Sequence, residues 1–97
     1  MTNVEFHPAA RTEVTTATNW YLERSNSAAA EFVREIQHAV ERIAESPERY
    51  PVTRKGWRRF VLLNFPFDLV YRTLQHRIEI IAVAHHSRRP GYWHHRK

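Results

Sequence analysis

Residues 58–85, RRFVLLNFPFDLVYRTLQHRIEIIAVAH, contain three runs with the composition of β-strands, and these runs determine the predicted architecture. Apolar, β-branched and aromatic residues are frequent in each run, and turn residues separate the runs. The turns are Asn64-Phe65-Pro66 and Gln75-His76, which are short enough to join antiparallel neighbours. The last run is apolar on both faces, which indicates a central strand. The sequence therefore predicts three consecutive antiparallel strands, at residues 58–64, 67–74 and 77–85.

Upstream of these strands, the apolar residues have the spacing of a helix. Four of them recur at intervals of four, three and four, namely Ala10, Val14, Ala17 and Tyr21. This spacing places them on one face of an amphipathic helix, and Pro8 suits its first turn. We expect this helix at about residues 8–24, after a short first strand at residues 3–6.

A second helix is predicted at about residues 27–45. Its apolar stripe has the same period and consists of Phe32, Ile36, Ala39 or Val40, and Ile43. Residues that favour a helix N-cap precede it at Ser25-Asn26-Ser27, and Pro47 follows it as a stop. Because the loop between the helices is short, we expect an antiparallel helical hairpin.

The predicted order of elements is β-α-α-β-β-β. It covers residues 1–97 as a single domain, because 97 residues leave no room for two. We expect an α+β fold in which the helical hairpin packs on one face of a twisted, mainly antiparallel sheet. The opposite face, or part of it, is expected to stay open to solvent with its basic residues.

The composition excludes several classes of protein. Cysteine is absent, which excludes a disulfide framework and thiol catalysis. The N-terminal segment MTNVEFHPAARTEV is polar and lacks the apolar centre of a signal peptide. The longest apolar run, residues 78–84, is interrupted by Glu79 and is too short to cross a bilayer. We expect a cytoplasmic protein without a membrane partner.

Charge is divided unevenly along the chain. Residues 1–50 contain five Arg and eight Glu, a net charge of −3, whereas residues 51–97 contain ten Lys or Arg against Asp68 and Glu79, a net charge of +8. This polarity predicts an electropositive surface, built by the C-terminal half, that faces an anionic partner. The alternative is a basic strand face that is only solvated. Residues 94–97 are interpreted as a frayed basic end.

Seven segments together carry a resemblance to a known superfamily. None of them is specific alone, but their order and spacing extend over nearly the whole chain. The chain resembles the RelE/ParE superfamily, the toxins of bacterial type II toxin–antitoxin systems, which are also called plasmid stabilization systems. The segments are residues 19–23, 43–51, 58–60, 64–67, 70–72, 80–85 and 88–93.

The resemblance implies a toxin that arrests bacterial growth and is neutralised by a cognate antitoxin. It also implies the β-α-α-β-β-β fold that the periodicity predicts. The antitoxin is expected to add an amphipathic, acidic segment that folds on binding to the apolar seams beside the helices and to the basic half. The oligomeric state stays open between a homodimer and a toxin–antitoxin hetero-oligomer.

The superfamily divides by target, and one branch, which is RelE-like, cleaves messenger RNA on the ribosome. Such an endoribonuclease must move protons and stabilise negative charge. The resemblance implies basic residues at alternating positions of the second strand and near the start of the third. Arg59 matches one position, but Val61 and Asp68 stand where other basic residues are expected, and a carboxylate repels a phosphate. The catalytic candidates for this branch are Arg59, Arg89 and Tyr92.

The other branch is ParE-like and poisons DNA gyrase without known nuclease chemistry. The sequence favours the ParE-like interpretation. Gyrase binding requires a basic, aromatic surface but no set of catalytic residues. The RelE-like nuclease, a general RNA-binding module and an inactive copy remain as alternatives. The residues predicted to bind the target are Arg58, Arg59, Arg72, His86, Arg88, Arg89, Tyr92 and Trp93.

Further expectations concern single residues. Trp20 and Tyr21 are expected to be packing residues of the first helix. Arg72 either pairs with Asp68, four residues back on the same strand face, or faces a phosphate. Neither a metal nor another cofactor is expected, because adjacent histidines such as His85-His86 point to opposite faces of a strand and no cysteine is available.

Overall fold

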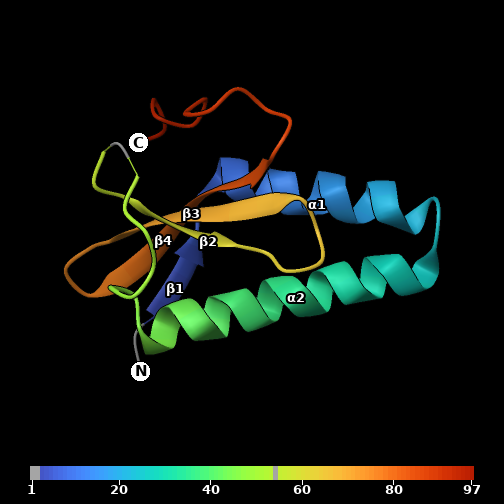
Figure 1. The fold of residues 1–97 in the computed structure, drawn as a ribbon, viewed down its shortest axis with the longest axis horizontal. Helices are drawn as coiled ribbons and strands as arrows, with labels where there is room; N and C mark the ends of the chain where they lie inside the picture. The colour runs from blue at the N-terminus through green and yellow to red at the C-terminus, as the bar shows by residue number, and fades with distance from the viewer. Residues whose placement is uncertain (1–2, 54) are drawn as a thin grey trace.

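The computed structural model describes residues 3–53 and 55–97. Its elements are β1 (Asn3–Phe6), α1 (Pro8–Leu22), α2 (Asn26–Glu45), β2 (Arg58–Val61), β3 (Phe67–Thr73) and β4 (Arg77–His85) (Figure 1). The strands lie in the order β1-β4-β3-β2, with β1 parallel to β4 and the other neighbours antiparallel. The predicted α+β fold is confirmed, and β4 is an inner strand, as its two apolar faces indicate.

Each helix begins at a side chain that caps it. Pro8 is the first residue of α1, and Nδ1 of His7 accepts a hydrogen bond from the N–H of Ala9 at 3.0 Å. The hydroxyl of Ser25 caps α2 by accepting from the N–H of Ala28 at 3.1 Å. These contacts satisfy N–H groups that have no partner inside the helix. Within residues 3–53 and 55–97, neither helix is long and apolar enough to cross a bilayer.

Three elements are shorter than predicted. Helix α1 and strand β3 end two residues and one residue early, respectively. Strand β2 ends at Val61 instead of residue 64. The cause is Glu35 of α2, whose carboxylate accepts hydrogen bonds from the backbone N–H groups of Leu63 and Asn64. The chain therefore turns from the sheet toward α2 immediately after β2.

The main core lies between the helices and one face of the sheet. Phe32 of α2 is fully buried, and its ring centre lies 5.3 Å from those of Tyr21, Phe65 and Phe67. Tyr71 is buried at the middle of β3, and its hydroxyl donates to the carbonyl of Pro47. Buried residues of both helices belong to this one cluster, which confirms that the hairpin packs on one face of the sheet.

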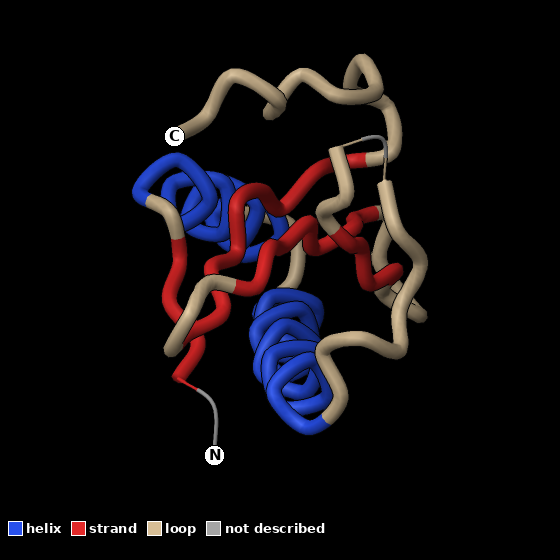
Figure 2. The backbone as a smooth tube through the Cα atoms, turned by 90° about the vertical axis from the view of Figure 1, so that its left-hand side faces the viewer, coloured by secondary structure: helices blue, strands red, loops and turns tan. Residues whose placement is uncertain are grey.

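The opposite face of the sheet is covered in part by the C-terminal tail, residues 86–97. In Figures 1 and 2 the tail and α2 lie on opposite sides of the strands. Trp93 of the tail belongs to a second cluster with Val70, Ile81 and Ala82, and its ring centre is 5.5 Å from that of Trp57. The rest of this face stays open, as predicted.

The substitution Phe32→Ala is expected to lower the free energy of unfolding by about 3–5 kcal/mol, because it removes an aromatic ring at the centre of the main core. Urea denaturation followed by circular dichroism measures this change. The matched control is Leu63→Ala, since Leu63 is apolar but 89% exposed, and its effect should stay within about 0.5 kcal/mol. Equal losses in the two variants would contradict the position of the core.

Candidate target-binding surface

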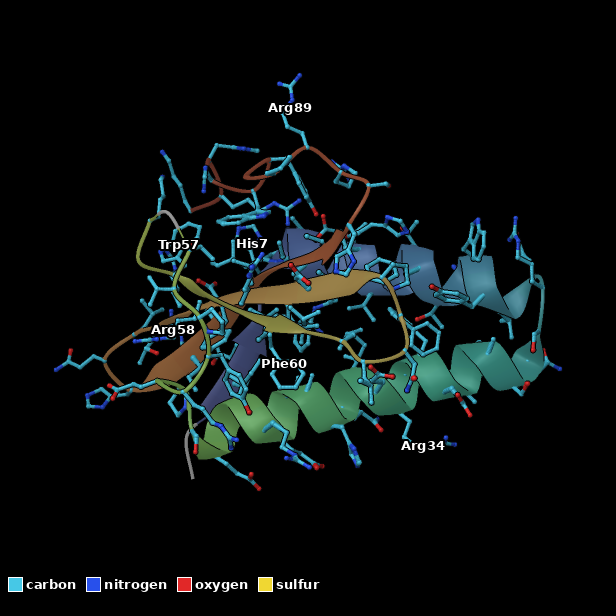
Figure 3. All side chains as sticks on the ribbon, viewed as in Figure 1. His7, Arg34, Trp57, Arg58, Phe60 and Arg89 are labelled. Carbon is cyan, nitrogen blue, oxygen red and sulfur yellow. The ribbon has the colours of Figure 1, made fainter. Side chains whose placement is uncertain are left out.

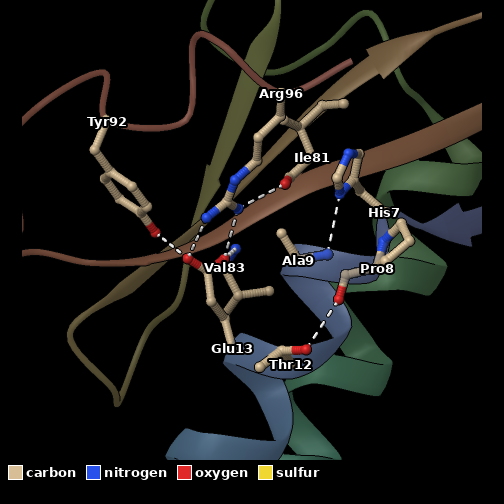
Figure 4. Close-up of polar contacts among 9 residues, drawn as sticks. All are labelled: His7, Pro8, Ala9, Thr12, Glu13, Ile81, Val83, Tyr92 and Arg96. Atoms are coloured by element: carbon tan, nitrogen blue, oxygen red, sulfur yellow. Dashed lines mark hydrogen bonds and ion pairs between the residues drawn. The ribbon is translucent and has the colours of Figure 1, made fainter.

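One carboxylate, that of Glu13 on α1, holds the tail against the rest of the fold (Figure 4). It accepts hydrogen bonds from the Arg96 guanidinium at 2.9 and 3.0 Å, from the backbone N–H of Val83 at 2.9 Å, and from the hydroxyl of Tyr92. Arg96 also donates to the carbonyl of Ile81 at 3.0 Å. Helix α1, strand β4 and the tail are therefore joined at a single group, which we call the Glu13 clasp.

The contacts of the clasp fix the protonation of its members. Burial raises the pKa of the Glu13 carboxyl, but the hydrogen bonds from Arg96, Tyr92 and Val83 outweigh burial and leave this pKa below its ordinary value. Burial, and then the hydrogen bond to Glu13, raise the pKa of the Tyr92 hydroxyl far above its ordinary value. At neutral pH Glu13 is therefore charged, and Tyr92 keeps its proton.

The open part of the second sheet face forms a cleft of about 550 Å³ beside the tail. We call it the open cleft. Its floor is apolar and includes Val61, Val70 and Ala84. Among the described residues that line it, Asp68 is the only acidic one. The basic side chains and imidazoles around it are Arg59, His85, His86, Arg88, Arg89 and His94.

Both oxygens of Asp68 are engaged in the open cleft. Oδ1 lies 2.8 Å from Nε2 of His86, and Oδ2 lies 3.7 Å from the Arg59 guanidinium. Taken alone, the Asp68 carboxylate would repel a phosphate. In the structure its charge is offset by Arg59, and a protonated His86 makes the group of three net positive. The fold thus brings together two predicted target-binding residues around the acidic one. No group of three or more histidine, aspartate or glutamate side chains in the described part of the chain is arranged to hold a metal ion.

Arg88 and Arg89 present two positive charges on the surface of the tail. Both residues are exposed. The guanidinium of Arg88 stacks on Tyr92, 3.9 Å from the ring centre. The side chain of Arg89 points away from the body of the protein (Figure 3). The clasp, by fixing Tyr92, therefore also supports the position of Arg88.

Arg58 and Arg72 are used within the fold and lie together outside the open cleft. Arg58 donates to the carbonyl of Tyr50 at 2.8 Å. Arg72 forms an ion pair with Glu79 at 2.7 Å. The predicted pairing of Arg72 with Asp68 is wrong, because the register of β3 and β4 places Glu79 directly opposite Arg72.

Two tryptophans differ in burial from what their predicted roles would suggest. Trp93, predicted to contact the target, is 7% exposed and packs on the sheet beneath the tail. Trp20, predicted to pack, is 52% exposed, and the Arg24 guanidinium lies 3.7 Å from its ring centre. Tyr21 does pack as predicted, with its ring centre 5.0 Å from that of Phe65.

No pattern in the sequence indicates the Glu13 clasp. Glu13 stands beside the apolar stripe of α1 and has the pattern of an ordinary polar helix residue. Arg96 belongs to the segment interpreted as frayed, yet it pairs with Glu13 across 83 positions of the chain. The interpretation of residues 94–97 as a frayed end is therefore wrong for Arg96. No local pattern links two positions so far apart.

A second groove, of about 600 Å³, lies between α1 and the beginning of the tail. We call it the apolar groove, because its lining includes Ala17, Trp20, Phe67 and Val83. Arg88 contributes to the same lining and adds positive charge. The groove therefore offers an apolar surface next to one of the exposed arginines of the tail.

The fold, the basic tail and the half-open sheet face define a small toxin-like domain of the RelE/ParE type. Over residues 4–90 the sequence matches the family described as the ParE toxin of the type II toxin–antitoxin system, parDE. The chain belongs to this family, which makes it the toxin of a type II toxin–antitoxin pair and gives it a cognate antitoxin as partner.

A solved structure supports the fold. It is a chain described as the chromosomal ParDE TA system from P. aeruginosa, and it superposes with a TM-score of 0.76 over 88% of this chain and 96% of that chain. The two chains are 18% identical, so the likeness concerns the fold. A comparison with curated protein sequences gave no match.

The substitution Glu13→Gln is expected to lower the free energy of unfolding by about 3 kcal/mol near neutral pH, because it leaves Arg96 without its charged partner. The pKa of Glu13 is lowered by folding. Its contribution is therefore complete above the ordinary carboxyl pKa and is lost as the pH falls through the folded-state value. The difference between wild type and variant should shrink below about pH 4. Urea denaturation over a pH series measures it.

The control for this prediction is Glu5→Gln. Glu5 also pairs with an arginine, Arg77, at 3.4 Å, but both side chains are about half exposed. An exposed pair contributes at most about 1 kcal/mol. If Glu13→Gln costs no more than Glu5→Gln, the clasp is not a stabilising centre of this fold.

Proposed function

We propose that this toxin arrests growth by binding DNA gyrase through the exposed arginines of its tail, and that it does not cut RNA. One observation carries the proposal: the hydroxyl of Tyr92, the best proton carrier among the nuclease candidates, is bound to Glu13. A hydroxyl whose pKa is raised and whose proton is already donated to a carboxylate is a poor general base.

The other nuclease candidates support the same interpretation. Arg59 lies beside Asp68, which offsets part of the charge that a scissile phosphate would need. Val61 lines the open cleft without a charge. Phosphodiester cleavage requires charge donors and proton carriers that reach the reacting atoms together. Of the three candidates, only Arg89 has a side chain that forms no ion pair or hydrogen bond with another described residue. This side chain points away from the body of the protein (Figure 3).

The tail has the properties of a surface that binds a large partner. Arginine and tyrosine supply a large share of binding energy in protein interfaces. Arg88 is held over Tyr92 and Arg89 projects into solvent, so both charges are positioned without being neutralised. A binding surface of this kind needs no catalytic geometry.

The apolar groove is the surface that we assign to the antitoxin. Its lining is mostly apolar, and Arg88 adds a positive charge to it. An amphipathic helix with acidic flanks fits a groove of this kind, since its apolar face enters the groove and its charges meet the basic tail. An antitoxin segment in the groove also covers Arg88, and this accounts for neutralisation by direct competition with the target.

The double variant Arg88→Ala, Arg89→Ala is expected to inhibit gyrase supercoiling about 100-fold less strongly than the wild-type toxin, because it removes two arginines from the centre of the binding surface. Purified gyrase and relaxed plasmid DNA provide the assay. Arg34→Ala is the matched control, since Arg34 is an exposed arginine on α2, far from the tail (Figure 3). It should inhibit like the wild type.

A second assay tests the nuclease alternative with the same proteins. Toxin is added to translating ribosomes, and the message is examined for cuts at codon positions. Cuts that disappear in Arg59→Ala or Tyr92→Phe, together with unimpaired gyrase, would overturn the proposed target.

The variant Thr16→Arg is expected to weaken antitoxin binding by about 100-fold, because a long charged side chain then enters the apolar groove. Thr15→Arg is the control, since Thr15 is the neighbouring exposed threonine of α1 and does not line the groove. Titration calorimetry with the cognate antitoxin measures both affinities. Equal affinities would place the antitoxin elsewhere on the toxin.

A further inference from the structure

The open cleft holds a histidine whose geometry links its charge to ligand binding. Nε2 of His86 is 2.8 Å from Oδ1 of Asp68. Because a carboxylate only accepts hydrogen bonds, Nε2 carries a proton in this contact. The backbone N–H of His86 donates to the carbonyl of Pro66 at 2.8 Å and fixes the residue at the end of β4. Within the described part of the chain, the other ring nitrogen, Nδ1, makes no hydrogen bond.

The charge of the cleft favours an anion. Asp68 is the one acidic group in its described lining, and Arg59 and His86 already engage both of its oxygens. Since these two residues bind the same carboxylate, their cationic groups lie within reach of a single oxyanion. The other charged or titratable residues that line the cleft with His86 are Asp68 from β3, Arg59 from β2, His85 from β4, and Arg88, Arg89, Tyr92 and His94 from the tail.

The shape of the cleft favours an anion that carries apolar surface. Val61, Val70 and Ala84 form an uncharged floor beside the cationic groups, in a volume of about 550 Å³. Free inorganic ions would leave this floor without a contact. A phosphodiester flanked by sugars and bases places its charge on the cations and its apolar faces on the floor.

We propose that the open cleft binds one phosphodiester group of a nucleic acid, with Arg59 and His86 as its anion contacts, and that His86 takes up a proton as the group binds. A neutral His86 presents the lone pair of Nδ1 to the anion, whereas a protonated His86 presents an N–H donor and a positive charge. Asp68 is a positioning residue that orients the ring. This inference does not depend on gyrase as the target.

The test uses the whole toxin and a dinucleotide, thymidylyl-thymidine, whose single phosphodiester keeps its charge over the pH range of the experiment. Nuclear magnetic resonance titration of the histidine ring signals measures affinity. Because histidine changes charge between about pH 5 and 8, we expect affinity near pH 6 to exceed affinity near pH 8 by about tenfold or more. The neutral methylphosphonate analogue should not bind.

Substitutions at position 86 separate the proposed role from a general basic attraction. His86→Gln keeps a hydrogen bond to Asp68 but cannot gain a proton, so binding should be weak and independent of pH. His86→Lys carries a charge throughout, so binding near pH 8 should match the wild type near pH 6. His38→Gln, on α2 and outside the cleft, is the control and should retain the wild-type pH dependence.

Three results would overturn the proposal: wild-type affinity that does not change with pH, a His86→Gln variant with the wild-type pH dependence, or equal binding of the methylphosphonate. Folding of every variant is checked by its amide spectrum. Uridylyl-uridine serves as the second arm. Tighter binding of it identifies RNA as the source of the phosphodiester, and tighter binding of the thymidine form identifies DNA. The gyrase assay measures supercoiling and not dinucleotide binding. The proposed target and the proposed phosphodiester site can therefore be contradicted independently.

Discussion

The ion pair between Glu13 and Arg96 is the contact on which the second face of the sheet depends. A carboxylate that is partly removed from water is costly unless charged or hydrogen-bonding partners surround it. Glu13 is met by the guanidinium, a tyrosine hydroxyl and a backbone N–H. To bring Arg96 to α1, the tail must cross the sheet. Trp93 is thereby laid over Val70 and covers one part of this face. The part that the tail does not reach becomes the open cleft.

The same contact separates binding from catalysis. Tyr92 is bound at Glu13, so its ring becomes a fixed platform for Arg88 while its hydroxyl is withdrawn from proton transfer. A nuclease would need the opposite arrangement, with a free hydroxyl and mobile charge near a scissile phosphate. In this tail the Tyr92 hydroxyl serves to hold the chain at Glu13, whereas an RNA-cleaving toxin would keep such a hydroxyl available for proton transfer. This arrangement supports the proposal that this toxin acts by occupying its target.

The sequence predicted the elements and their order because these depend on neighbours within about four positions along the chain. It failed where a residue is placed by a distant one. Arg96 and Glu13 are 83 positions apart, and no periodicity reports their contact. Arg72 was expected beside Asp68 on its own strand, yet the residue directly opposite on the next strand lies closer, and here it is Glu79. Trp93 was assigned to the target by its residue type alone, although it packs on the sheet with Val70, Ile81 and Ala82.

The effect of Asp68 on a bound anion depends on the residues around its carboxylate. In the sequence, a carboxylate near the third strand counts against a phosphate site, because like charges repel. In the structure this carboxylate orients His86 and lies beside Arg59. A carboxylate that accepts a hydrogen bond from one nitrogen of an imidazole orients the ring, so Asp68 leaves the other nitrogen of His86 free to meet an anion.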